Sequence, residues 1–161
     1  MLLDPAMKII LAEKNVPGMS KPEIDKFLET GHLILRFGTI DLDGGPAIHP
    51  VWYYYNNDRI YLFSGDKARK IRNVQKNNRV YFTIDTETQP NKGVRGKGTA
   101  RLIDETNRSV QYAEKIVQKY MDEKSPGYKD MIGYAKSGKA AVIEITPDYF
   151  TVWDYSKIPM M

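Results

Sequence analysis

Residues 61–82 read YLFSGDKARKIRNVQKNNRVYF, a pattern that predicts a strand, a tight turn, a short helix and a second strand. The first strand ends at the hydroxyl of Ser64, and the helix carries Lys67, Arg69 and Lys70 in its first turns. A helix N-terminus presents unpaired backbone N–H groups and the positive end of the helix dipole, so an anion is favoured there. With a hydroxyl and three cations beside it, this segment predicts a phosphate-binding site. The alternative is a surface connection whose lysines are only solvated.

A hydrophobic period of two, typical of strands, continues on both sides of this segment. It predicts strands at residues 32–40, 46–55, 59–64, 79–86, 93–103, 140–145 and 149–153. Helices are predicted at residues 20–31, in the segment that starts near Lys67, at 106–121 and from Ser125 through Tyr134. Turns such as the one at residues 41–45 are short enough to join neighbouring strands into hairpins. Consecutive strands with helices inserted late favour a β-rich fold, an antiparallel barrel with helices packed outside it.

The bulk properties predict one soluble domain. The 161 residues are 42% apolar and 27% charged, as in ordinary globular proteins. No apolar run approaches the roughly 18 residues that span a membrane. Residues 1–19 are expected to be a loosely attached arm with one amphipathic stretch, Met7–Leu11. Residues 20–161 are expected to form the domain, which starts with a helix at the capping box of Ser20 and Glu23.

The absence of cysteine and the net charge bear on which functions are possible. The chain contains no cysteine, which excludes disulfides, thiolate metal sites and a cysteine nucleophile, and agrees with a cytoplasmic location. Its N-terminus lacks the basic and then apolar order of a signal peptide. The net charge of +4 suits small anionic ligands and nucleic acid alike.

The other candidate motifs predict little chemistry. The two histidines, His32 and His49, have no carboxylates at a recognisable metal-ligand spacing, so no metal site is predicted. The glycines of Gly96-Lys-Gly98 lie inside a strand and open no helix, so they are not a dinucleotide-binding fingerprint. They indicate instead a bend or a close backbone approach in a barrel.

The run Trp52-Tyr53-Tyr54-Tyr55 is unusually aromatic for one strand. Alternation places Trp52 and Tyr54 on one side and Tyr53 and Tyr55 on the other. We favour a strand that is buried on both sides or lies in a dimer interface. The alternative is a platform on which a planar cofactor or a base stacks.

Five segments in order carry a family pattern. They are 38–44 (GTIDLDG), 46–52 (PAIHPVW), 63–80 with its Ser64 and Arg69-Lys70, 94–100 (VRGKGTA) and 145–154 with its closing Trp153. Their order and spacing resemble the pyridoxamine-phosphate-oxidase-like flavin-binding split-barrel family over roughly residues 20–156. The resemblance implies an antiparallel split β-barrel with flanking helices, and a homodimer with two FMN sites at the subunit interface.

The resemblance also implies which residues hold FMN. The strand Ile48–Trp52 would lie along the flavin ring, while Ser64 and the pair Arg69-Lys70 would hold the phosphate. The full set of implied cofactor contacts is Ile48, His49, Pro50, Val51, Trp52, Phe63, Ser64, Lys67, Arg69, Lys70, Lys97 and Trp153. The chain lacks the C-terminal Arg-x-His arrangement of the true oxidases, so the vitamin B6 reaction itself is not expected.

The function that we expect is a flavin-dependent oxidoreductase whose substrate the sequence does not identify. Because a flavin performs the hydride and electron chemistry, no catalytic base motif is needed. His49 and Tyr53 are the candidates for assisting a proton transfer.

Three alternatives remain open at this point. One is an enzyme of the same fold that uses the deazaflavin F420, whose longer anionic tail would need a larger basic surface, supplied by Lys67, Arg69, Lys70, Arg72 and Lys76. Another is a flavin-binding protein without catalysis. The least favoured is a basic barrel that binds nucleic acid by stacking bases on residues 52–54.

Overall fold

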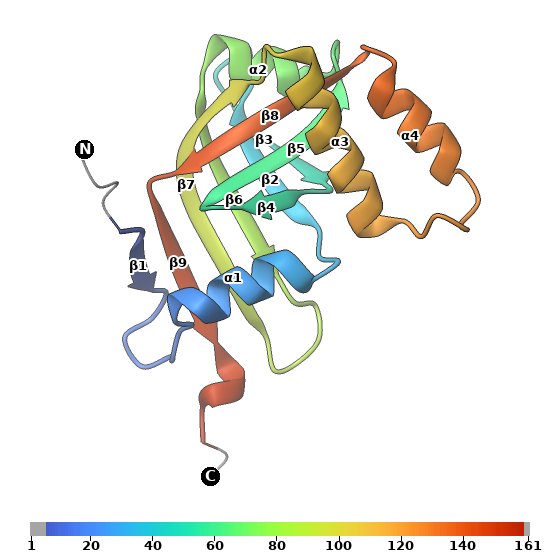
Figure 1. Cartoon of the computed structure of the whole chain (residues 1–161). Helices are drawn as coiled ribbons and strands as arrows, with labels where there is room; N and C mark the ends of the chain where they lie inside the picture. The colour runs from blue at the N-terminus through green and yellow to red at the C-terminus, as the bar shows by residue number, and fades with distance from the viewer. Residues whose placement is uncertain (1–5, 160–161) are drawn as a thin grey trace.

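The computed structural model describes residues 6–159, and this range contains nine strands and four α-helices (Figure 1). In chain order they are β1 (Lys8–Leu11), α1 (Lys21–Thr30), β2 (Leu35–Ile40), β3 (Pro46–Val51), β4 (Tyr54–Asn56), β5 (Arg59–Gly65), α2 (Arg69–Lys76), β6 (Arg79–Asp85), β7 (Lys92–Leu102), α3 (Thr106–Tyr120), α4 (Tyr128–Lys136), β8 (Ala140–Pro147) and β9 (Tyr149–Asp154). One 3-10 turn, Tyr155–Lys157, follows β9. Within the described range, no helix has the length and apolar character needed to cross a membrane.

The strands form one curled sheet in the order β3-β2-β6-β7-β8-β5-β4, and each neighbouring pair in this order is antiparallel. β9 extends the sheet by pairing with the first half of β7, beside β8. In Figure 1, α3 lies across β5 and β8, α4 lies outside α3, and α1 crosses one end of the barrel. The predicted β-rich fold, an antiparallel split barrel with flanking helices, is confirmed.

Alternating burial gives β2 and its neighbours an inner and an outer face. Leu35, Phe37 and Thr39 of β2 are buried on the inner face, where the main apolar core lies. The residues between them, such as Gly38, point to the outer face. This period of two is the signal that predicted the strand. It also fixes the face to which each candidate site residue belongs, because a shift of one residue would exchange the two faces.

The glycines of β7 permit a close crossing of the chain. A Cβ atom at Gly96 would collide with the carbonyl oxygen of Tyr149, and one at Gly98 with the carbonyl oxygen of Thr146. These two oxygens flank the corner where β8 turns into β9 over β7. The predicted close backbone approach is therefore confirmed, and glycine is required because any side chain would force the two strands apart.

The N-terminal segment is more firmly held than predicted. Residues 8–11 form β1, which pairs in parallel with residues 149–152 of β9. Val16 and Met19, between β1 and α1, are buried. The expectation of a loosely attached arm was wrong for these residues, because the edge of β9 offers backbone partners that the local sequence does not reveal. Residues 1–5 of that expected arm lie outside the described residues.

Several element boundaries also differ from the prediction, and two of them concern the candidate site. The strand predicted at residues 46–55 is interrupted at Trp52 and Tyr53, so that β3 and β4 pair with different neighbours, β2 and β5. Helix α2 begins at Arg69, with Ala68 as its N-cap and no side-chain cap. Helix α1 begins as predicted, with the full capping box of Ser20 and Glu23.

Candidate anion-binding site

The end of β5 and the first turn of α2 bring a hydroxyl and a lysine together. Lys70 Nζ donates a hydrogen bond of 3.1 Å to Ser64 Oγ. Burial lowers the pKa of Lys70, and the described residues place no carboxylate within 4.0 Å of its ammonium group. A half-buried cation without a counter-ion is costly unless an anion binds there. We refer to His49, Ser64, Arg69 and Lys70 as the Lys70 site.

His49 joins this site from β3 across the inner face of the sheet. Its Nε2 lies 3.1 Å from the Thr39 hydroxyl. Thr39 in turn contacts the buried amide of Asn73 on α2 at 2.9 Å. Burial and the neighbouring Lys70 lower the pKa of His49 below its usual value, although Asp41 opposes this. The imidazole is therefore neutral at pH 7.

The amide orientation of Asn73 determines which imidazole nitrogen carries the proton. With its amide nitrogen turned toward Asp41 Oδ1 at 3.2 Å, the Asn73 oxygen accepts the Thr39 hydroxyl proton. Thr39 then accepts from His49, which must carry its proton on Nε2. His49 Nδ1 has no hydrogen-bond partner among the described residues and is left as an acceptor.

Asp41 is an acidic neighbour that the sequence analysis assigned only to a turn. Its Oδ1 lies 3.4 Å from Arg69 Nε, and the Arg69 side chain is 67% exposed. Arg69 is thus an exposed cation with an acidic partner, whereas Lys70 is a half-buried cation without one among the described residues. An anion at this site would compete with Asp41 for Arg69 and would meet Lys70 directly.

The outer face of the same sheet carries a large cavity of about 770 Å³. Ile48, Gly38, Tyr81 and Lys97 lie in one row across β3, β2, β6 and β7. Ile48 is 74% exposed and Tyr81 58% exposed. Gly38 between them has no side chain, so the sheet surface is hollowed there. The cavity is also lined by three arginines and no carboxylate; they are Arg36, Arg79 and Arg95.

The structure brings together some of the predicted contacts and separates others. His49, Ser64, Arg69 and Lys70 converge on the Lys70 site, while Ile48 and Pro50 point to the outer face. Val51 packs on the inner core, and Lys67 is exposed ahead of α2.

The other predicted contacts have partners within the chain. Lys97 Nζ lies over the Tyr149 ring, 5.9 Å from its centroid, and Trp153 Nε1 donates to Asn91 Oδ1 at 2.5 Å. Trp52 stacks on Tyr120 of α3, and Phe63 lies beside Tyr134 of α4.

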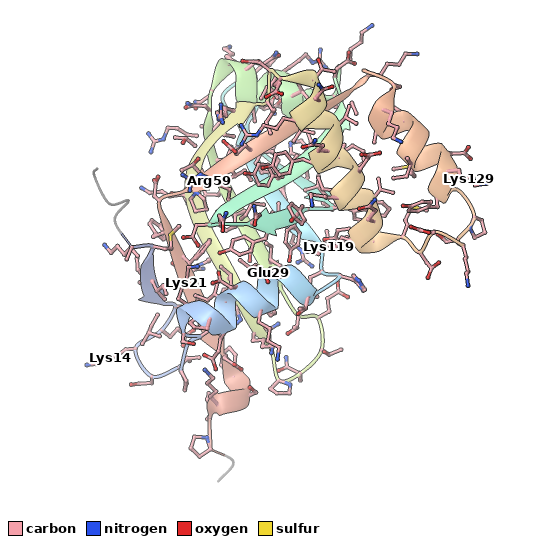
Figure 2. All side chains as sticks on the ribbon, in the orientation of Figure 1. Lys14, Lys21, Glu29, Arg59, Lys119 and Lys129 are labelled. Carbon is pink, nitrogen blue, oxygen red and sulfur yellow. The ribbon has the colours of Figure 1, made fainter. Side chains whose placement is uncertain are left out.

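The candidate role of Tyr53 in proton transfer is not supported. Tyr53 is fully buried, and its hydroxyl donates a 2.9 Å hydrogen bond to the Leu28 carbonyl. The ring also lies 3.5 Å from Nζ of Lys119, the α3 residue labelled in Figure 2. Burial raises the pKa of the Tyr53 hydroxyl far above its ordinary value. Tyr53 is a core residue that supports α1, and it lies in the break between β3 and β4 rather than on one strand buried on both sides.

Sequence reasoning missed Thr39, Asp41, Asn73 and the three arginines of the outer cavity. Thr39 and Asp41 belong to a strand and a turn that were already explained by local structure. A signal for Asn73 was available, since an amide is rarely placed on the buried side of a helix without a polar partner. In residues 6–159 no cluster of three or more metal-ligating side chains is present.

Residues 20–154 match the family model described as Pyridoxamine 5'-phosphate oxidase. No curated protein matches the chain. Among solved structures, the conserved hypothetical protein Rv2991 of Mycobacterium tuberculosis is 23% identical with a TM-score of 0.77, over 92% of this chain and 94% of that one. An FAD-binding protein of Mesorhizobium loti is 25% identical with a TM-score of 0.63, over 86% and 96% of the two chains. An F420 reductase is 17% identical with a TM-score of 0.61, over 78% and 94%.

Proposed function

The chain belongs to the pyridoxamine 5'-phosphate oxidase family, and from this premise we propose that it is a flavoprotein oxidoreductase that binds FMN. The phosphate group would lie in the Lys70 site, between the end of β5 and the start of α2. The ring would lie along β3 toward the outer face, beside Ile48. The name of one structural relative, an FAD-binding protein, agrees with a flavin ligand, whereas the name of the F420 reductase agrees with the deazaflavin alternative.

The observation that carries the proposal is the cation at Lys70, which forms no ion pair within residues 6–159. Its ammonium group is half-buried, donates to Ser64 Oγ at 3.1 Å, and has a pKa that burial alone lowers. A phosphate would supply the missing negative charge and accept hydrogen bonds from both residues. Arg69, which is exposed and held only by Asp41 at 3.4 Å, can turn toward the same anion.

We propose further that the protein acts as a homodimer with the cofactor at the subunit interface. Ile48 and Tyr81 are large apolar side chains that remain exposed in one row on either side of Gly38. Apolar patches of this kind mark surfaces that another protein covers. A second copy would cover this row and close the cavity around the ring.

A bound flavin supplies the hydride and electron transfer, and the chain positions it. Ser64, Lys70 and Arg69 would hold the phosphate and so fix the distance of the ring from β3. His49 is neutral and presents Nδ1 as an acceptor on the inner face, opposite Ile48, so its place is at the phosphate end of the cofactor and not beside the ring. Arg36 of the outer cavity is paired with Asp85 at 2.8 Å, but Arg79 and Arg95 form no ion pair in the described range and favour a substrate with negative charge.

The first experiment is a visible absorption spectrum of the purified protein, repeated after FMN is added and the excess is removed by gel filtration. Retention of about one flavin per chain on a dimer-sized peak would support the proposal. If FMN is not retained but F420 is, the deazaflavin enzyme replaces it. Retention of neither would refute a flavin function. A retained flavin that no electron donor reduces would leave a binding protein without catalysis.

Paired substitutions on α2 test the phosphate assignment. Arg69→Ala with Lys70→Ala removes two charge-assisted contacts and should weaken FMN binding at least about tenfold without unfolding the protein. Arg72→Ala with Lys76→Ala is the matched control, because both side chains are exposed on the same helix. Equal affinities in the two double variants, measured by fluorescence titration, would contradict the assignment. A loss confined to the Arg72 and Lys76 variant would favour the longer F420 tail.

A further inference from the structure

A second cavity of about 380 Å³ lies between β4 and the first three turns of α3. β4 pairs with residues 59–61, at the other end of β5 from Ser64. The cavity shares no lining residue with the Lys70 site or with the cavity on the outer face. It is therefore a separate feature that the proposed flavin function does not use.

Three amide side chains line this cavity without a hydrogen-bond partner among the described residues. They are Asn56 of β4 and Asn107 and Gln111 of α3. Each amide offers both a donor and an acceptor. Such groups can recognise the edge of a ring that carries both donors and acceptors, as amides do with nucleobases.

Two tyrosines and two cations complete the lining. Lys115 Nζ lies 5.3 Å from the centroid of the Tyr54 ring, and Arg108 Cζ lies 5.6 Å from that of Tyr112. Tyr112 is held rigidly, since it stacks on Tyr61 with a centroid separation of 3.8 Å and an interplanar angle of 9°. Rigid aromatic faces are favourable surfaces for stacking a planar ring.

The charges at the cavity leave one cation free for a ligand. Arg108 is paired with the buried Glu144 at 3.3 Å, and Arg101 pairs with the same carboxylate at 2.7 Å. Lys115 forms no ion pair among the described residues. Glu105 is the one carboxylate in the lining; it is exposed and has no ion-pair partner in the described range. Lys115 is therefore the cation of the lining that remains available to a ligand.

We propose that this cavity binds a nucleoside monophosphate. The base would stack on a tyrosine of the lining and be read by the three amides, and Lys115 would hold the phosphate. The volume lies within the range of known small-molecule pockets. A nucleotide site on α3, away from the flavin, would give the protein a second ligand.

Calorimetric titration of AMP into the full chain tests the proposal. AMP should bind saturably and more tightly than adenosine, which lacks the phosphate, or ribose 5-phosphate, which lacks the base. Lys115→Gln should weaken AMP binding about tenfold, and Gln111→Ala should also weaken it. Lys129→Gln, on α4 (Figure 2), is the matched control and should bind AMP as the parent protein does.

The same titration separates this proposal from the flavin proposal. The double variant Arg69→Ala and Lys70→Ala should bind AMP normally, whether or not it binds FMN. If that variant loses AMP, the nucleotide was occupying the Lys70 site, and the second site is refuted. Absence of saturable AMP binding, or unchanged binding in both Lys115→Gln and Gln111→Ala, would likewise overturn it.

Discussion

At the scale of single residues, two partly buried lysines differ in what can compensate their charge. Lys70 faces a hydroxyl and a space that an anion can enter, so its charge can be compensated by a ligand. Lys119 instead points into the core between α3 and α1. Its Nζ donates to the Leu28 carbonyl at 3.0 Å and lies over the Tyr53 ring. Glu29, labelled near it in Figure 2, opposes the effect of burial only weakly.

Lys119 should make the stability of the protein depend on pH. Burial lowers its pKa to about 7 in the folded protein, whereas an unfolded lysine titrates near about 10.4. Between these values the unfolded state binds more protons, so the free energy of unfolding should rise with pH. The slope is at most about 1.4 kcal/mol per pH unit, reduced by the partial exposure of the side chain.

Replacement of this lysine provides the measurement. Lys119→Met should unfold at higher urea concentration than the parent protein near pH 6, and the difference should shrink toward about pH 10. Lys129→Met, at an exposed position, serves as the control and should show no such trend. A constant difference between Lys119→Met and the parent protein across this range would refute the titration of Lys119.

At the scale of elements, the crossing of β7 beneath the β8–β9 corner leaves the least room for a side chain. Gly98→Ala would place a methyl group against the Thr146 carbonyl and should destabilise the protein by about 1–3 kcal/mol or more. Gly133→Ala on α4 is the matched control. A Cβ there would meet nothing within 4 Å, and the better helix propensity should add up to about 1 kcal/mol. Equal denaturation midpoints for the two variants would refute the close approach.

The sequence predicted correctly those structural elements that are determined by residues close together in the chain. The alternation of β2, the Asp-Gly turn and the capping box each depend on neighbouring residues, and all three are confirmed. The break after Val51 could not be predicted, because four aromatic residues suit a continuous strand equally well. It arises where Trp52 leaves the sheet to stack on Tyr120 of α3, at a centroid distance of 5.0 Å.

In the candidate site, too, the contacts between residues close in sequence could be predicted, and the contacts between distant elements could not. Ser64 and Lys70 are six positions apart, and the turn between them was visible in the sequence. Asp41 was assigned to a turn because Asp is common there. Its contact with Arg69 depends on how α2 packs on the sheet, and a pattern of neighbouring residues carries no information about that packing.

At the scale of the whole molecule, the exposed row on the outer face predicts the oligomeric state. Ile48→Glu with Tyr81→Glu should convert a dimer into a monomer, because two carboxylates would be buried in each half of the interface. Leu42→Glu is the control, since Leu42 is also exposed but lies in the turn before β3. Sedimentation velocity of the three proteins provides the measurement. A double variant that still sediments as a dimer would place the interface elsewhere.

The pairing of β1 with β9 joins the two ends of the described chain. During synthesis on the ribosome, residues 8–11 are made long before their partner strand, residues 149–152. Ile9, Ile10 and Leu11 are exposed even after pairing, so they remain uncovered throughout translation. β1 can therefore join the barrel only after β9 has been made, and until then the growing chain presents an apolar strand to chaperones.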